Sequence, residues 1–244
     1  SSDLLQQHLH WAAPYQPPVL RVLAMQRAVA LAPNVIVTAG GQLLDDNNGF
    51  SNSELCEHMP AGYNGIVAAG GQLLMAMRHR ETARVNEPMI YLPADVNYAH
   101  WVYGVLPRLA AFVGTEHENL PILLHGDVAS FHRDALRVMG VDDGRLRIHA
   151  ARVRVECKQL FYCTTSYSHH APSATGVRHV REQVAKRVQP GEVKRLYLAR
   201  RHAKDRTLIN EAEVIALLER HGFTAIDPEQ HDFATQASYA AGAD

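Results

Sequence analysis

The chain has 244 residues, enough for one large domain or two modest ones with a sizeable core. Hydrophobic residues make up 47% and charged residues 20%, as in an ordinary globular protein. The formal net charge of −1 gives no overall field that would recruit nucleic acid or an anionic membrane. No apolar run approaches the ~20 residues that a helix needs to cross a bilayer.

Up to residue 85 the only segment with a clear strand pattern is 34–38. From residue 88 onward, strands and helices alternate. The pattern predicts strands at 88–92, 121–125 and 145–149, helices at 97–112 and 127–139, further strand at 153–163, and then a helix with an apolar stripe of Val177, Val180, Val184 and Val188. This alternation is typical of a parallel α/β sheet.

A turn at Gln189-Pro190-Gly191 marks a domain boundary, which divides the chain into 1–190 and 191–244. The second part is expected to form a strand at 194–199, a helix capped by Asn210, a strand at 223–226 and a helix that starts at Asp232. The inward face of the first of these helices is predicted to consist of Val214, Ile215, Leu217 and Leu218.

Cysteine and histidine give no metal signature. Cys56, Cys157 and Cys163 lack a C-x-x-C spacing and indicate reduced thiols, as in a cytoplasm. The adjacent His169 and His170 have no partner at metal-ligand spacing, which favours solvated loop residues over the alternative of a metal site. We therefore predict no metal and no cofactor.

A cation-rich loop follows the strand predicted at 194–199. It holds Arg200, Arg201, Lys204 and Arg206 within seven residues. Ligands of doubly wound sheets bind outside the carboxyl ends of the strands, and arginine pairs well with phosphate oxygens. Without a glycine, the loop is neither a Rossmann nor a Walker loop. It is either a diphosphate site built from side chains or a solvated basic loop.

Residues 97–109 read N-Y-A-H-W-V-Y-G-V-L-P-R-L. On a regular helix, one side would carry Asn97, His100, Gly104 and Arg108. The glycine one turn after His100 would leave the imidazole open to a ligand. His100 is therefore either a ligand-facing group or a core histidine packed with Trp101.

These two segments resemble glycosyltransferase family 61. The first is similar to its Asn-Tyr-x-His-Trp…Leu-Pro-Arg-Leu signature. The second, Leu196 to Arg206 with Ile209-Asn210-Glu211, resembles its Ser-Arg…Arg…Asn-Glu block, with Ala199 in place of serine. Gly222-Phe223 and Asp232-Phe233 continue the resemblance, which covers about residues 85–244.

The resemblance implies an α/β protein of the GT-B type: a pair of Rossmann-like domains with the active site between them. A donor-binding His-Gly-Ala-Gly-type segment is expected beyond Asp244, so the second domain should be incomplete and the 244 residues inactive by themselves. The implied enzyme is of a bacterial type that makes capsular or exopolysaccharide. It would transfer a sugar from a nucleotide-sugar donor to a glycan or lipid-linked saccharide, or to another hydroxyl acceptor, with inversion and without a metal.

The same resemblance assigns roles to particular residues. His100 is the candidate catalytic group, Arg200 and Arg206 are expected to bind the donor diphosphate, and Asn97, Trp101 and Arg108 form an acceptor-side or structural motif. The family's usual acid one turn after the histidine is replaced by Gly104, which leaves the identity of the base open. The alternative is a non-catalytic glycan- or nucleotide-binding protein that keeps the fold. A cytoplasmic location is expected, including one peripheral to the inner membrane.

Overall fold

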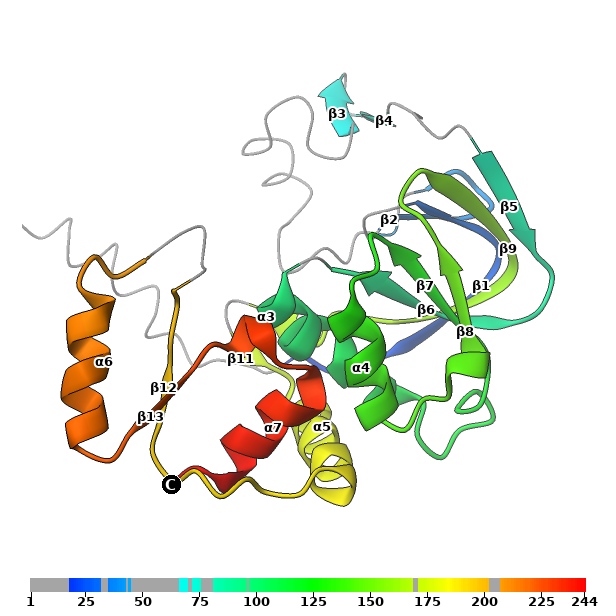
Figure 1. The fold of residues 1–244 in the computed structure, drawn as a ribbon. Coiled ribbons are helices and arrows are strands. Elements are labelled where there is room, and N and C mark those ends of the chain that lie inside the picture. The colour runs from blue at the N-terminus through cyan, green and yellow to red at the C-terminus, as the bar shows by residue number, and fades with distance from the viewer. Residues whose placement is uncertain are drawn as a thin grey trace, which may run out of the picture.

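The computed structural model describes residues 18–31, 35–42, 44, 66–69, 72–75, 81–95, 97–168, 171–201 and 207–244. Within these residues there is one seven-stranded mixed sheet and three two-stranded sheets, with helices packed on the large sheet (Figure 1). The predicted mixture of strands and helices is confirmed. His169, His170 and Arg206, together with Cys56, lie outside the described residues.

The large sheet has the order β2-β1-β9-β6-β7-β8, and β5 also pairs with β9. Its strands are β1 (Val22–Leu31), β2 (Val35–Val37), β5 (Glu81–Val85), β6 (Met89–Ala94), β7 (Ile122–Gly126), β8 (Leu146–His149) and β9 (Val153–Cys163). The predicted parallel strands are confirmed, because β6, β7, β8 and β9 pair in parallel. The sequence pattern missed β1, which pairs antiparallel with both β2 and β9.

The sheet has a hydrophobic core on each face, so every residue of β6 and β7 is buried. On one face, Ile90 and Leu124 pack under the helices. On the other face, Tyr91 and Leu123 pack against residues of β1 and β9. The long strand β9 connects the two sides of the sheet, since its first half pairs with β5 and its second half with β6.

Three regular helices cover the first face: α4 (Ser130–Val138), α5 (Ala174–Arg187) and α7 (Phe233–Gly242). The predicted stop of α4 at Gly140 is confirmed, because this residue has a φ of 82°, which favours glycine. Val180, Val184 and Val188 contact the core as expected, whereas Val177 is not part of it. The small sheets are β3 (Ile66–Ala69) with β4 (Gln72–Met75), and β10 (Tyr167–Ser168) with β11 (Ala171–Pro172).

The prediction of one continuous helix at 97–112 is wrong. The segment is a short α-helix α3 (Tyr98–His100), a π-helical turn η3 (Trp101–Val105) and a 3₁₀ segment η4 (Leu106–Ala111). Pro107 accounts for part of this irregularity, because it has no N–H to donate to the carbonyl of Tyr103 in the α-helical pattern. Single π-helical turns of this kind occur often at functional sites.

Two side chains satisfy the carbonyl groups of the irregular turn. Arg108, only 1% exposed, donates from Nε to the Gly104 carbonyl over 2.7 Å. Ser166 Oγ lies 2.9 Å from the same carbonyl oxygen and 3.2 Å from that of Tyr103. Arg108 Nη1 also donates to the Tyr162 hydroxyl and the Cys163 carbonyl, at the end of β9. The guanidinium thus fastens the segment that carries His100 to the sheet.

The elements β12 (Leu196–Leu198), α6 (Glu211–Arg220) and β13 (Thr224–Ile226) form a parallel βαβ unit, followed by the 3₁₀ turn η6 (Pro228–Gln230) (Figure 1). Two details differ from the prediction. Leu217 is exposed rather than buried, because the described residues place only a two-stranded sheet beneath α6. Asn210 occupies the N-cap position, but its side chain makes no capping hydrogen bond.

Helix α7 follows this unit in the sequence yet packs on the large sheet. Phe233 is part of the core beneath α4 and α5. The C-terminal half of α7 binds the segment that connects the two parts of the chain. The Gly191 N–H donates to the Ser238 carbonyl, and Lys194 Nζ donates to the Gly242 carbonyl. The predicted division at residue 191 therefore assigns α7 to the second part of the chain, although this helix packs on the large sheet of the first part.

Replacing Arg108 tests its structural role. Arg108→Met keeps much of the side-chain volume but leaves buried acceptors without a donor, so the free energy of unfolding should fall by about 3 kcal/mol. Urea denaturation followed by circular dichroism measures the change. The exposed Arg178 provides a matched control, because Arg178→Met should change stability by about 0.5 kcal/mol or less. Equal stabilities of the two variants would contradict a structural role for Arg108.

Candidate functional site

The first candidate site lies at the carboxyl end of β6, where parallel strands commonly present ligand-binding groups. Asp95 follows β6 directly, and α3 begins three residues later. Asn97 caps α3, because its Oδ1 accepts from the N–H groups of Ala99 and His100 at 3.0 and 3.2 Å. The motif residue Asn97 therefore fixes the backbone turn from which His100 extends.

His100 lies beside an acid that the sequence motif did not reveal. Its Nδ1 is 3.4 Å from Asp95 Oδ2, and the two side chains are 52% and 26% exposed. The other carboxylate oxygen of Asp95 accepts from the Asn97 N–H at 2.8 Å. This arrangement leaves the imidazole accessible and gives it an acidic neighbour although Gly104 occupies the usual acid position. A carboxylate directly after a buried strand was the sequence signal that could have identified Asp95.

A buried histidine fixes the backbone of Asp95. His132 of α4 is fully buried; its Nδ1 accepts from the Ala129 N–H at 2.9 Å, and its Nε2 lies 2.8 Å from the Asp95 carbonyl oxygen. These partners place the proton of a neutral imidazole on Nε2. Burial lowers the pKa of His132, and the hydrogen bonds to Asp95 and Ala129 oppose that shift. His132 thus stays neutral and holds the strand end in place.

The structure separates the other motif residues from His100. Trp101 is fully buried, with its ring edge against His132 at a centroid distance of 4.6 Å. Arg108 is buried as well, whereas His100 is half exposed, so the two residues that the helical pattern placed on one side differ in accessibility. The π-helical turn between them interrupts the regular spacing on which that placement relied. Trp101 and Arg108 occupy structural positions, and His100 with Asp95 forms the accessible pair.

The second candidate site lies at the carboxyl ends of β12 and β13. Arg200 follows β12, and its backbone N–H donates to Glu211 Oε1 over 2.7 Å. The neighbouring Arg201 donates from Nη1 to Asp227 Oδ2 over 2.9 Å, and Asp227 follows β13. Arginines and carboxylates therefore gather where a βαβ unit ordinarily binds an anionic ligand. Arg200 was predicted from the sequence, and Glu211 was noted only as part of the family-like Asn-Glu block, whereas Asp227 was not predicted.

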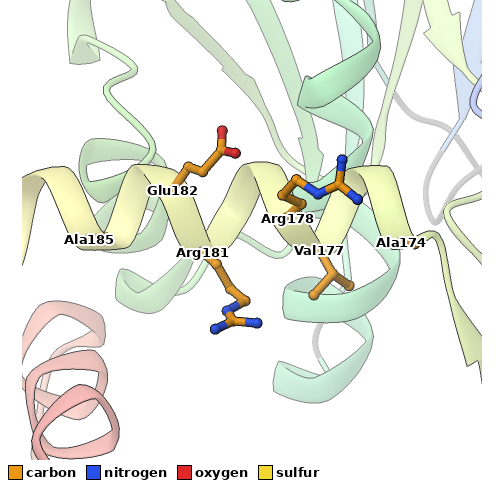
Figure 2. Close-up of a pocket in the computed structure, with 6 residues that line it drawn as sticks. All are labelled: Ala174, Val177, Arg178, Arg181, Glu182 and Ala185. Carbon is orange, nitrogen blue, oxygen red and sulfur yellow. The ribbon is translucent and has the colours of Figure 1, made fainter.

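A shallow groove lies elsewhere, along α5 (Figure 2). It is lined by Ala174, Val177, Arg178, Arg181, Glu182 and Ala185, all from this one helix. None of these residues belongs to either candidate site. Among the described residues, no group of three or more histidine, cysteine or acidic side chains lies close enough to hold a metal ion. In the same part of the chain, no helix is long and apolar enough to cross a membrane.

Polar and charged groups at the carboxyl ends of parallel strands are typical of α/β enzymes that bind phosphorylated ligands. The family model described as Glycosyltransferase 61 matches residues 98–244, which is more than half of the chain. The chain therefore belongs to glycosyltransferase family 61. Membership supports a transferase that takes a sugar from a donor to an acceptor.

The family resemblance drawn from the sequence is thus confirmed, and the matched residues include His100, Arg108, Arg200 and Glu211. A search of curated proteins finds no match, and neither does a search of solved structures.

The lowered pKa of His132 predicts a loss of stability in acid. The folded state binds the imidazole proton less readily than the unfolded chain, where histidine titrates near pH ~6.5. Stability should therefore be full above this pH and decrease as the pH falls below it. Melting temperatures at pH 7.5 and 5.5 measure the decrease, which His132→Gln should reduce because glutamine keeps an N–H donor but cannot be protonated. The exposed His221 provides the control, since His221→Gln makes the same substitution at a position outside the core.

Proposed function

We propose that this protein is an inverting, metal-independent glycosyltransferase that uses a nucleotide-sugar donor. Its acceptor is a hydroxyl group of a glycan or a lipid-linked saccharide, in bacterial capsular or exopolysaccharide assembly. The observation that carries the proposal is the accessible His100–Asp95 pair at the carboxyl end of β6, within a chain of this family. The cytoplasmic location expected from the number and spacing of the cysteines stays a prediction.

The proposed arrangement is of the GT-B type. The large sheet and its helices would bind the acceptor, and the β12–α6–β13 unit would begin the donor-binding domain. Each part has polar groups at the carboxyl ends of its parallel strands, in line with the usual location of ligands in such folds. The division into residues 1–190 and 191–244 is part of this proposal, with α7 as a contact between the two parts.

His100 is the proposed general base. With Asp95 near Nδ1, the neutral imidazole carries its proton on that nitrogen and has a lone pair on Nε2. Nε2 takes the proton of the acceptor hydroxyl while the hydroxyl oxygen attacks the anomeric carbon from the face opposite the diphosphate. The bond from the anomeric carbon to the diphosphate oxygen breaks, and the electron pair leaves with the diphosphate. The anomeric configuration is inverted, and Asp95 stabilises the imidazolium formed.

Arg200 and Arg206 are the proposed partners of the departing diphosphate. Arginine offers a planar fork of donors that matches phosphate oxygens, and charge that is stabilised as the bond breaks speeds the reaction. Their guanidinium groups would neutralise the negative charge of the leaving group, a role that a metal ion fills in other enzymes.

Substitution of His100 tests the proposed base. In the full-length protein, His100→Gln should lower turnover by about 10²–10⁴-fold, because glutamine can bind the acceptor hydroxyl but cannot take its proton. The melting temperature should stay the same, since the side chain is half exposed. Release of nucleoside diphosphate from UDP-, GDP- and dTDP-sugars in the presence of acceptor measures turnover. The exposed His221→Gln is the control, and unchanged turnover of His100→Gln would rule out this base.

Substitution of Arg200 tests the donor side. Arg200→Ala removes charge-assisted hydrogen bonds worth about 1.5–3 kcal/mol, so nucleoside diphosphate should bind roughly tenfold or more weakly. Arg200→Lys should restore binding only in part, because lysine lacks the planar fork. Calorimetric titration with UDP and GDP measures the affinities, and Arg195→Ala at the start of β12 is the control. Binding by Arg200→Ala at the affinity of the unmodified protein would show that this loop is a solvated surface. Binding without any transfer by the unmodified protein would favour the non-catalytic alternative.

A further inference from the structure

Glu211 is a buried carboxylate next to the proposed donor loop. It is 7% exposed and is the first residue of α6. Its Oε1 accepts from the Arg200 backbone N–H at 2.7 Å and from the Tyr197 hydroxyl at 3.1 Å. Burial of a carboxylate is unfavourable unless donors satisfy it, so these two hydrogen bonds define the position of the side chain. The family-like Asn-Glu pair thus provides its glutamate for a contact across the loop.

The hydrogen bond from the Arg200 N–H to Glu211 lies directly after the pairing between β12 and β13 ends. Ala199 N–H still donates to the Ile226 carbonyl at 2.8 Å, as part of the pairing between β12 and β13. Arg200 has the next backbone donor, and Glu211 accepts from it in place of a strand. Glu211 therefore determines the direction in which the chain leaves β12.

A second carboxylate holds the following residue. Asp227, whose side chain is 11% exposed, accepts from Arg201 Nη1 at 2.9 Å. The first two residues of the loop are thereby fixed from different elements, Arg200 by α6 and Arg201 by the end of β13. A basic loop on the surface that only provided solubility would not need two such anchors.

The geometry points to Glu211 as a positioning residue for the donor diphosphate, which it serves by holding the backbone from which Arg200 extends. This inference rests on the proposed function, because it takes the loop after β12 as the diphosphate site. Glu211 does not touch the diphosphate in this account. Its contribution is the hydrogen bond that it accepts from the Arg200 N–H. The side chain must therefore be long enough to reach this N–H, whereas its negative charge is dispensable.

Four variants separate reach from charge. Glu211→Gln keeps an acceptor at the same distance without the charge, whereas Glu211→Asp keeps the charge but is too short to reach Arg200 N–H. Glu211→Ala removes both, and Tyr197→Phe removes the second donor but keeps the bond to Arg200. Titration calorimetry of the full-length protein with UDP, GDP, ADP and dTDP gives the dissociation constants, and circular dichroism gives the folded fraction used to correct them.

The expected result is a weakening of about tenfold for Glu211→Ala and Glu211→Asp, with Glu211→Gln and Tyr197→Phe within about threefold of the unmodified protein. In transfer assays, the donor KM should rise for the first two variants while kcat stays the same. If Glu211→Ala does not fold, the comparison of Glu211→Asp with Glu211→Gln decides in the same way.

Two results would overturn the inference. Unchanged affinity of Glu211→Asp would show that reach to Arg200 does not matter, and weakening of Glu211→Gln by as much as Glu211→Asp would show that the negative charge is not dispensable. Failure of the unmodified protein to bind any of the four diphosphates would have a different meaning. It would refute the proposed donor site itself, and with it every role based on that site.

Discussion

The buried guanidinium of Arg108 is the interaction on which the arrangement of this protein most depends. Pro107 contributes to the irregular turn in the segment that carries His100, and this turn leaves carbonyl groups that need donors. Arg108 and Ser166 provide these donors, and Arg108 also reaches Tyr162 on β9. One side chain therefore stabilises the irregular turn and attaches it to the sheet. Without this attachment, the position of His100 relative to the strand ends would not be defined.

The two candidate sites share one structural device. In each, a buried polar side chain on a helix forms a hydrogen bond with a backbone group just beyond a strand. His132 on α4 bonds the carbonyl of Asp95 after β6, and Glu211 on α6 bonds the N–H of Arg200 after β12. A helix is rigid, so a hydrogen bond from it restrains the loop more than a bond within the loop would. The exposed groups that would contact ligands, above all His100, are then held by residues that ligands do not touch.

Helix α7 connects the two parts of the chain. It follows the β12–α6–β13 unit, yet Phe233 lies in the core beneath α4 and α5, with its ring 6.4 Å from that of Tyr98. Tyr98 is two residues from His100. The same helix holds Gly191, in the connecting segment, through the Ser238 carbonyl. The N-terminal end of α7 thus brings the chain from the β12–α6–β13 unit to the helical turn that precedes His100.

Local patterns were enough to predict the parallel strands β6, β7 and β8, the stop of α4 at Gly140 and the family, because these depend on apolar runs, a left-handed backbone conformation and short motifs. Which motif residues are accessible could not be predicted in this way, because it depends on contacts between distant segments. Arg108 bonds to a residue 54 positions away, and His132 reaches Asp95 over 37 positions. Helical periodicity assumes a regular helix and treats each segment alone, so it placed Arg108 beside His100. The π-helical turn and the partners of these side chains arise from contacts between distant segments, and a local pattern contains no information about them.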